Sequence, residues 1–135
     1  MRKALFTILG LSVLVDLALG AWASVTWESF VSSWLPDLKP LIGAQAQEVR
    51  LLGLVLGLCL LCYAAIQILA IKWIRDEKEE GLNLAILFGG YLIVSSVITF
   101  LLFQNHWEFL LVDGVRGAVL TVFAVVVRNA PSTIR

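Results

Sequence analysis

The sequence predicts an all-α polytopic membrane protein, folded as an antiparallel four-helix transmembrane bundle that forms a single domain over residues 1–135. Two observations predict this class. Hydrophobic residues make up 60% of the chain and charged residues 15%, whereas soluble domains carry about 25% charged residues. Four apolar runs, at 4–24, 49–74, 82–104 and 109–128, each approach or exceed the ~20 residues that a membrane-spanning helix needs.

The first run follows Arg2 and Lys3 and ends near Ala21-Trp22-Ala23, which imitates a signal-peptidase site. A cleaved signal peptide is therefore an alternative to a membrane span. Asp16 favours the span, because it interrupts the part of a signal peptide that should be purely apolar. A carboxylate this deep in a membrane helix costs several kcal/mol unless it is paired or protonated.

Residues 27–35 predict a short amphipathic helix between the first two spans, because Trp27, Phe30 and Trp34 follow helical spacing. We expect this helix to lie in the membrane interface, with a lid over a cavity as the alternative. Trp107, in the turn before the last span, is expected at the same interface as part of an aromatic belt.

Small residues recur every three or four positions along the later spans, which places them on one face of each helix. Such faces let the backbone of a neighbouring helix approach closely. The predicted helix-packing residues are Gly53, Gly57, Ala64, Gly89, Ser96, Gly114 and Ala118. The charge run 75–81 reads as a solvated loop, with Gly81 breaking the helix.

Basic residues predict the orientation. Seven fall on one side of the four-span arrangement and only Lys39 and Arg50 flank the spans on the other, which places both termini in the cytoplasm. The seven are Arg2, Lys3, Lys72, Arg75, Lys78, Arg128 and Arg135.

That orientation brings two acids and two bases to the outer half of the membrane: Asp16, Arg50, Asp113 and Arg116. Because a low dielectric favours pairing, we expect Asp16 to pair with Arg116, and Asp113 with Arg50 or with Arg116 three residues along the same helix. The cluster either fixes helix register or forms a polar pocket that opens outward.

Cys59 and Cys62 form a C-x-x-C pair in LCLLCYAAIQ. This stretch resembles the membrane thiol oxidoreductases of the vitamin K epoxide reductase type, and the resemblance implies quinone-linked thiol chemistry. A second cysteine pair, which those enzymes use, is absent from this sequence. Packing as two small hydrophobic side chains is the other interpretation.

No cofactor is predicted from the sequence. His106, the only histidine, could ligate a single pigment magnesium or another metal from a neighbouring chain, although a histidine in a turn is usually just exposed. The balanced net charge gives no reason to expect a nucleic-acid partner.

Arg50, with two residues between it and Gly53, the repeat at Gly57 and the LLVDG segment around Asp113 are similar to small four-span bacterial membrane proteins of uncharacterised or DoxX-like type. This resemblance implies a four-helix bundle in a bacterial inner membrane and carries no catalytic residue to this chain.

Three functions follow as hypotheses. The first is a non-enzymatic accessory or scaffold subunit, whose partners are membrane lipids and other membrane proteins or further copies of itself. The second is a carrier or binding protein for a small amphiphile or lipid in the outer polar cluster. The third is a membrane thiol–quinone oxidoreductase.

Overall fold

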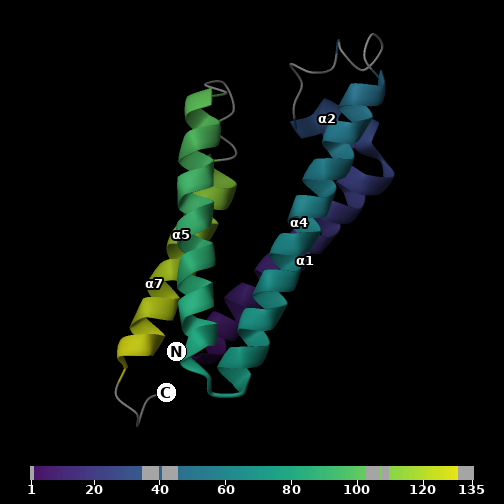
Figure 1. The fold of residues 1–135 in the computed structure, drawn as a ribbon. Helices are drawn as coiled ribbons and strands as arrows, with labels where there is room; N and C mark the ends of the chain where they lie inside the picture. Colours follow the sequence, from purple (N-terminus) through teal and green to yellow (C-terminus); the bar gives the residue numbers. More distant parts are fainter. Residues whose placement is uncertain (1, 35–39, 41–45, 103–106, 108–109, 131–135) are drawn as a thin grey trace. The chain divides into compact units, whose positions relative to one another are not determined.

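A computed structural model describes residues 2–34, 40, 46–102, 107 and 110–130 of the chain. These residues form a succession of helices, drawn in Figure 1. The elements are α1 (Arg2–Val25), α2 (Trp27–Trp34), α4 (Ala46–Arg75), α5 (Glu79–Leu102), the π-helix η2 (Leu110–Gly114) and α7 (Val115–Asn129).

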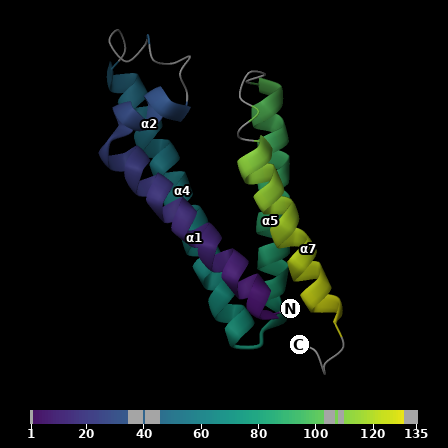
Figure 2. The same ribbon diagram turned by 180° about the vertical axis from the view of Figure 1, so that it is seen from behind.

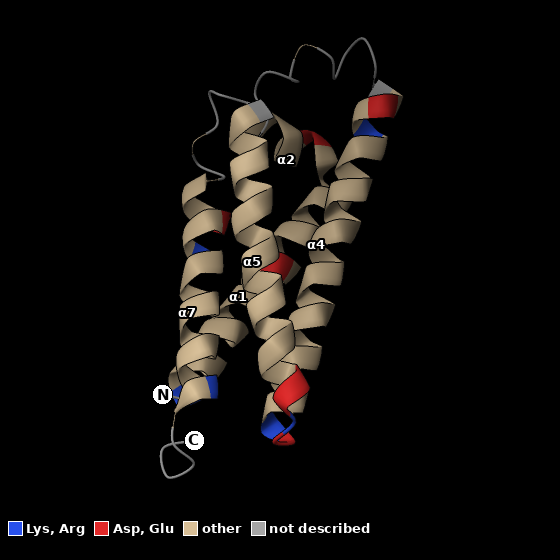
Figure 3. Ribbon diagram, turned by 60° about the vertical axis from the view of Figure 1, so that its left-hand side comes forward, with Lys and Arg blue, Asp and Glu red and all other residues tan. Residues whose placement is uncertain are grey.

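The predicted all-α class with four membrane-spanning helices is confirmed. Four helical stretches of 20 to 29 residues are long and apolar enough to cross a membrane, and they match the predicted spans within three residues at each end. Their bounds are Arg2–Val25, Gln47–Arg75, Glu79–Leu101 and Leu110–Asn129. Figure 3 shows most charged residues towards the helix ends and a few within the helices.

The chain divides into two compact units, which are described separately. One comprises Met1–Ser12 with Ile66–Arg135, and the other is Val13–Ala65. We call them the terminal unit and the inner unit. The terminal unit contains α5, η2 and α7 together with the start of α1 and the end of α4; the inner unit contains the remainder of α1 and α4 with α2 between them.

In the inner unit, α1 and α4 pack closely because glycines remove side chains from the contact. A Cβ atom at Gly20 would lie 3.1 Å from the carbonyl oxygen of Gly57, and one at Gly53 would lie 3.5 Å from the carbonyl oxygen of Ala23. The contacts run in opposite directions along the sequence, so the two helices are antiparallel, as expected for consecutive spans.

The α2 helix packs its apolar face on protein. Phe30 is 6% exposed and forms a buried cluster with Ala23, Val31 and Val49. The ring of Phe30 meets Trp22 edge to face, with centroids 5.6 Å apart. The helix predicted to lie in the interface is therefore present, and the aromatic side chain expected to enter lipid instead covers the ends of two spans.

In the terminal unit, α5 and α7 lie side by side, as Figures 1 and 2 show from opposite directions. A Cβ atom at Gly117 would lie 2.5 Å from the carbonyl oxygen of Gly89, so the two backbones are nearly in contact. Near the other end of the pair, Nη1 of Arg128 lies 3.3 Å from Oδ1 of Asn83. These contacts show that α5 and α7 are antiparallel, as the short connection between them predicts.

One predicted packing residue of α7, Ala118, lies outside the buried stripe of this helix. Ala118 is exposed, and the buried stripe of α7 consists of Gly117, Leu120, Ala124 and Val127. Successive residues turn about 100° around a helix, so the stripe that contains Gly117 leaves Ala118 to one side. The spacing of four from Gly114 to Ala118 is compatible with either face, and the sequence did not distinguish them.

Residues 75–80 are exposed, as expected of the predicted solvated loop, and they form a tight turn between α4 and α5. Its hydrogen bonds from the Glu77 N–H to Ile74 and from the Lys78 N–H to Trp73 form a Schellman arrangement, with Glu77 at a φ of 61°. Gly81 does not break the helix but lies within α5, where a Cβ atom would come 2.6 Å from the nitrogen of Ile74. Glycine at 81 therefore permits α5 to start directly against the end of α4.

Candidate functional site

The last span carries an ion pair at a change of helix type. Asp113 lies in η2 and Arg116 in the first turn of α7, and Nη2 of Arg116 is 3.1 Å from Oδ1 of Asp113. The predicted local pairing of these two residues is confirmed. A single turn of π-helix holds one extra residue and occurs frequently at functional sites. The ion pair therefore joins the π-helix to the first turn of α7.

The ion pair is only partly covered. The Asp113 side chain is 33% exposed and the Arg116 side chain 12% exposed. Two charges within a span have lost much of their hydration, and their attraction offsets this loss only when the geometry is good. An arrangement of this kind can accept and donate hydrogen bonds to a polar group inside the membrane, which aliphatic side chains cannot do.

Ser96 on α5 lies beside the π-helix. A Cβ atom at Gly114 would be 3.0 Å from Oγ of Ser96, and the Ser96 hydroxyl donates to the carbonyl of Ile93 at 2.8 Å. Ser96 is 2% exposed. Glycine at 114 thus leaves room for a buried hydroxyl group close to the ion pair, and both residues occupy the packing positions predicted for them.

Buried polar side chains also occur on the other spans. Asp16 is fully buried, Ser12 is 3% exposed and Gln67 is 1% exposed. The sequence singled out Asp16 but not Gln67 as a site residue, although an amide in the middle of an apolar run was a usable signal. Thr121 was missed as well: its Oγ1 is buried and has no hydrogen-bond partner among the described residues.

The four charged residues predicted to form one cluster are divided between the two units. Arg50 is exposed on α4 and belongs, with Asp16, to the inner unit, whereas Asp113 and Arg116 belong to the terminal unit. Pairing of Asp16 with Arg116, or of Arg50 with Asp113, stays a prediction.

The remaining candidates are placed as follows. Ala64 is fully buried, in keeping with its predicted packing position, and Trp107 is 57% exposed. His106 and the side chain of Trp34 lie outside the described residues. Within the described ranges, no group of three His, Cys, Asp or Glu side chains could hold a metal ion.

Cys59 and Cys62 are both exposed on α4 and carry free thiols. Positions three apart share a face of the helix, so both thiols are accessible from the same side. Their exposure makes them surface groups of the span and not the packed core side chains that one sequence interpretation expected.

Comparisons with known proteins assign no function to this chain. No protein-family model, no curated protein and no solved structure matches this chain. The similarities to DoxX-like proteins and to thiol oxidoreductases, drawn from short motifs, stay expectations. What the chain shows by itself is a multi-pass membrane protein with a partly covered ion pair in its last span.

Proposed function

We propose that the chain is a non-enzymatic integral membrane protein that serves as an accessory or scaffold subunit. Its partner is a transmembrane helix of another membrane protein, which docks on the face of the α5–α7 pair that carries Gly90 and Ala118. We place it in a bacterial inner membrane, as the resemblance to small bacterial four-span proteins implies, with both termini in the cytoplasm, as the basic residues favour.

This proposal rests on two adjacent glycines of α5, Gly89 and Gly90, of which only Gly89 is in close contact with another helix. Gly89 packs against Gly117, but a Cβ atom at Gly90 would have nothing within 4 Å. Glycine inside a helix costs roughly 0.5–1 kcal/mol relative to alanine, so contacts within the described part of the chain give no reason for it at position 90. Close approach by a helix of another protein would supply the reason.

Ala118 extends the same face. Gly90 follows Gly89 by one residue, as Ala118 follows Gly117, and Gly89 and Gly117 face one another. Because the two helices are antiparallel, a 100° step along each one turns towards the same side of the pair. Gly90 and exposed Ala118 therefore form a shallow surface across both helices, of the small-residue type that membrane helices use to associate.

The test is gentle detergent extraction of the full chain, with mass spectrometry of the proteins that remain bound. We expect a stoichiometric membrane partner with the native sequence, weaker retention of it with Gly90→Ala and its loss with Gly90→Trp. Gly10→Trp is the matched control, because a Cβ atom at Gly10 also has nothing within 4 Å and Gly10 lies on α1, outside this face. A monomer without a partner, or equal retention by Gly90→Trp and Gly10→Trp, would contradict the proposal.

A second candidate, a binding protein for a small amphiphile, is favoured by the buried polar side chains of Ser12, Asp16, Gln67 and Ser96. Intramembrane polar groups often mark a ligand path. Under this proposal the extracted protein is monodisperse without a protein partner and retains one amphiphile, which Asp16→Leu removes and Ser29→Ala, a change on exposed α2, does not.

The thiol–quinone alternative is supported by the shared exposure of Cys59 and Cys62. Its test is quinone reduction with the native chain and with Cys59→Ser. Unchanged activity in the variant would remove this alternative.

A further inference from the structure

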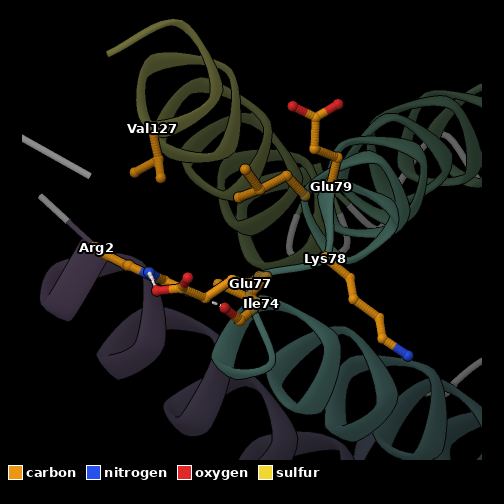
Figure 4. Close-up of a pocket in the computed structure, with 7 residues that line it drawn as sticks. Arg2, Ile74, Glu77, Lys78, Glu79 and Val127 are labelled. Atoms are coloured by element: carbon orange, nitrogen blue, oxygen red, sulfur yellow. Dashed lines mark hydrogen bonds and ion pairs between the residues drawn. The ribbon is translucent and has the colours of Figure 1, made fainter. Parts of the chain in front are cut away.

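A cavity of about 320 Å³ lies in the terminal unit, where α1 begins, α4 ends, α5 begins and α7 ends (Figure 4). Its aliphatic lining comes from Ile74, Leu82 and Val127, one residue from each of three helices, and all three are buried. Small-molecule sites begin at about 300 Å³, so the cavity matches a polar headgroup with its first carbons and not a whole lipid.

Charged side chains complete the lining of this cavity. Arg2 and Lys78 supply two positive charges and Glu77 and Glu79 two negative charges, so the lining is neutral overall. Figure 4 shows Arg2 and Glu77 directed towards each other, while the Lys78 side chain extends away from them. Arg2 and Glu77 thus present one cationic and one anionic group side by side, which is complementary to a zwitterion and not to an ion of one sign.

Arg2 is the best placed of these groups to bind an anion. Its Nη1 lies 3.4 Å from Oε1 of Glu77, and its Nη2 donates to the carbonyl oxygen of Ile74. The Arg2 side chain is 25% exposed, whereas that of Glu77 is 81% exposed. A long contact to an exposed carboxylate contributes little stability, so a ligand oxygen can replace it at small cost.

Glu77 occupies a position where glycine is usual. Its φ of 61° belongs to the left-handed region, which carries a conformational cost for any residue with a Cβ atom. Residues held in such conformations cluster at ligand sites. Here the arrangement keeps a carboxylate at the edge of the cavity.

The cavity also lies at the level of lipid headgroups. The apolar stretches that could span a membrane end at Arg75 and begin again at Glu79, on either side of the turn that borders the cavity. Helix ends of this kind meet the polar boundary of the bilayer.

We propose that this cavity binds the headgroup of a phospholipid that carries a phosphate and a primary ammonium. The Arg2 guanidinium binds the phosphate through paired hydrogen bonds, and the Glu77 carboxylate accepts hydrogen bonds from the ammonium. Ile74, Leu82 and Val127 contact the glycerol and the first methylene groups. A quaternary ammonium cannot donate to Glu77, and a headgroup with only negative charge meets two carboxylates.

The test is native mass spectrometry of the full chain in detergent micelles, with equal amounts of phosphatidylethanolamine, phosphatidylcholine and phosphatidylglycerol. We expect phosphatidylethanolamine to be retained about fivefold more than either other lipid, the ratio that one hydrogen bond of about 1 kcal/mol to an exposed carboxylate gives. Soluble phosphoethanolamine, which lacks the acyl chains, is a fourth arm and is expected to bind far more weakly.

Three variants test whether the lipid binds in this cavity. Arg2→Gln should lower retention of phosphatidylethanolamine about fivefold, whereas Lys3→Gln, which removes a neighbouring exposed cation outside the cavity, should leave it unchanged. Glu77→Gln should abolish the preference over phosphatidylcholine without reducing total lipid retention. Circular dichroism at helical wavelengths checks that each variant is folded. The effect of Glu77→Gln on the lipid preference tests the proposal even when Arg2→Gln does not fold.

Equal retention of the three lipids by the native chain would overturn the proposal, as would equal effects of Arg2→Gln and Lys3→Gln. A preference for phosphatidylglycerol would show an anion site instead. Binding of soluble phosphoethanolamine as tightly as the lipid would exclude the lipid as the ligand class. None of these outcomes bears on docking at Gly90, so the two proposals fail separately.

Discussion

Asp113 and Arg116 form an ion pair at 3.1 Å across the junction of the π-helix and α7, within a stretch apolar enough to span a membrane. The two charges are close in sequence, so their pairing requires only this junction to form. We therefore expect the last span to be more stable with both charges, or with neither, than with one charge alone.

Removing one charge should destabilise the protein more than removing both. Arg116→Ala removes the guanidinium that lies 3.1 Å from Asp113, and we expect a loss of about 1–3 kcal/mol, less than for a fully buried pair because Asp113 is one third exposed. The double variant Asp113→Asn with Arg116→Gln should lose less. Thermal unfolding in mild detergent measures both, and a double variant at least as unstable as Arg116→Ala would contradict the expectation.

The contact between Gly89 and Gly117 should not tolerate side chains. Gly117→Leu would place atoms within 2.5 Å of the Gly89 carbonyl oxygen, so α5 and α7 must separate, at a cost of roughly 3 kcal/mol or more. Gly90→Ala, one residue from Gly89 and with open space around it, should instead stabilise the helix by up to about 1 kcal/mol. Denaturation in detergent compares the two, and similar stabilities would rule out the close contact.

Truncating Phe30 should release α2 from the two spans that it covers. Because Phe30 is 6% exposed and packs on Ala23, Val31 and Val49, Phe30→Ala should cost about 3–5 kcal/mol of local stability. Hydrogen exchange of the α2 amides should rise accordingly. Trp107→Ala serves as the control, since Trp107 is 57% exposed and its removal should leave those amides unchanged.

Glycine at position 77 should stabilise the turn between α4 and α5. Glu77→Gly removes the cost of a left-handed residue, roughly 1–2 kcal/mol, and loses only a long, exposed ion pair with Arg2. We expect a higher unfolding temperature for Glu77→Gly and a lower one for Glu77→Val, because a β-branched residue suits a positive φ poorly. A lower unfolding temperature for Glu77→Gly would show that the carboxylate matters more than the backbone.

The positions of the spans could be predicted from the sequence because a bilayer requires about 20 consecutive apolar residues, a signal that needs no knowledge of tertiary contacts. The pair of Asp113 and Arg116 was predictable for a similar reason, since it is local. The sequence could not show that Ala118 lies beside the buried stripe of α7, because a helical spacing of four fits two neighbouring stripes and only the contact between Gly89 and Gly117 selects one.

The cavity near Arg2 could not be predicted from the sequence. Glutamate at position 77 gives no signal for a left-handed turn, and the hydrogen bond from Arg2 to Ile74 joins residues 72 positions apart. The charge run was correctly predicted to be solvated, but nothing in it indicates that Arg2 meets Glu77. Gly81 was misread because its small size serves the approach of α5 to Ile74 and not a break in the helix.

The hydrogen bond from Arg2 to the carbonyl of Ile74 also sets an order of assembly. Residue 2 emerges from the ribosome long before residue 74, so this hydrogen bond cannot form until the second span has been synthesised. The first two spans are thus secured together as a hairpin, and a stalled chain that ends before Ile74 should leave its amino-terminal residues open to proteases.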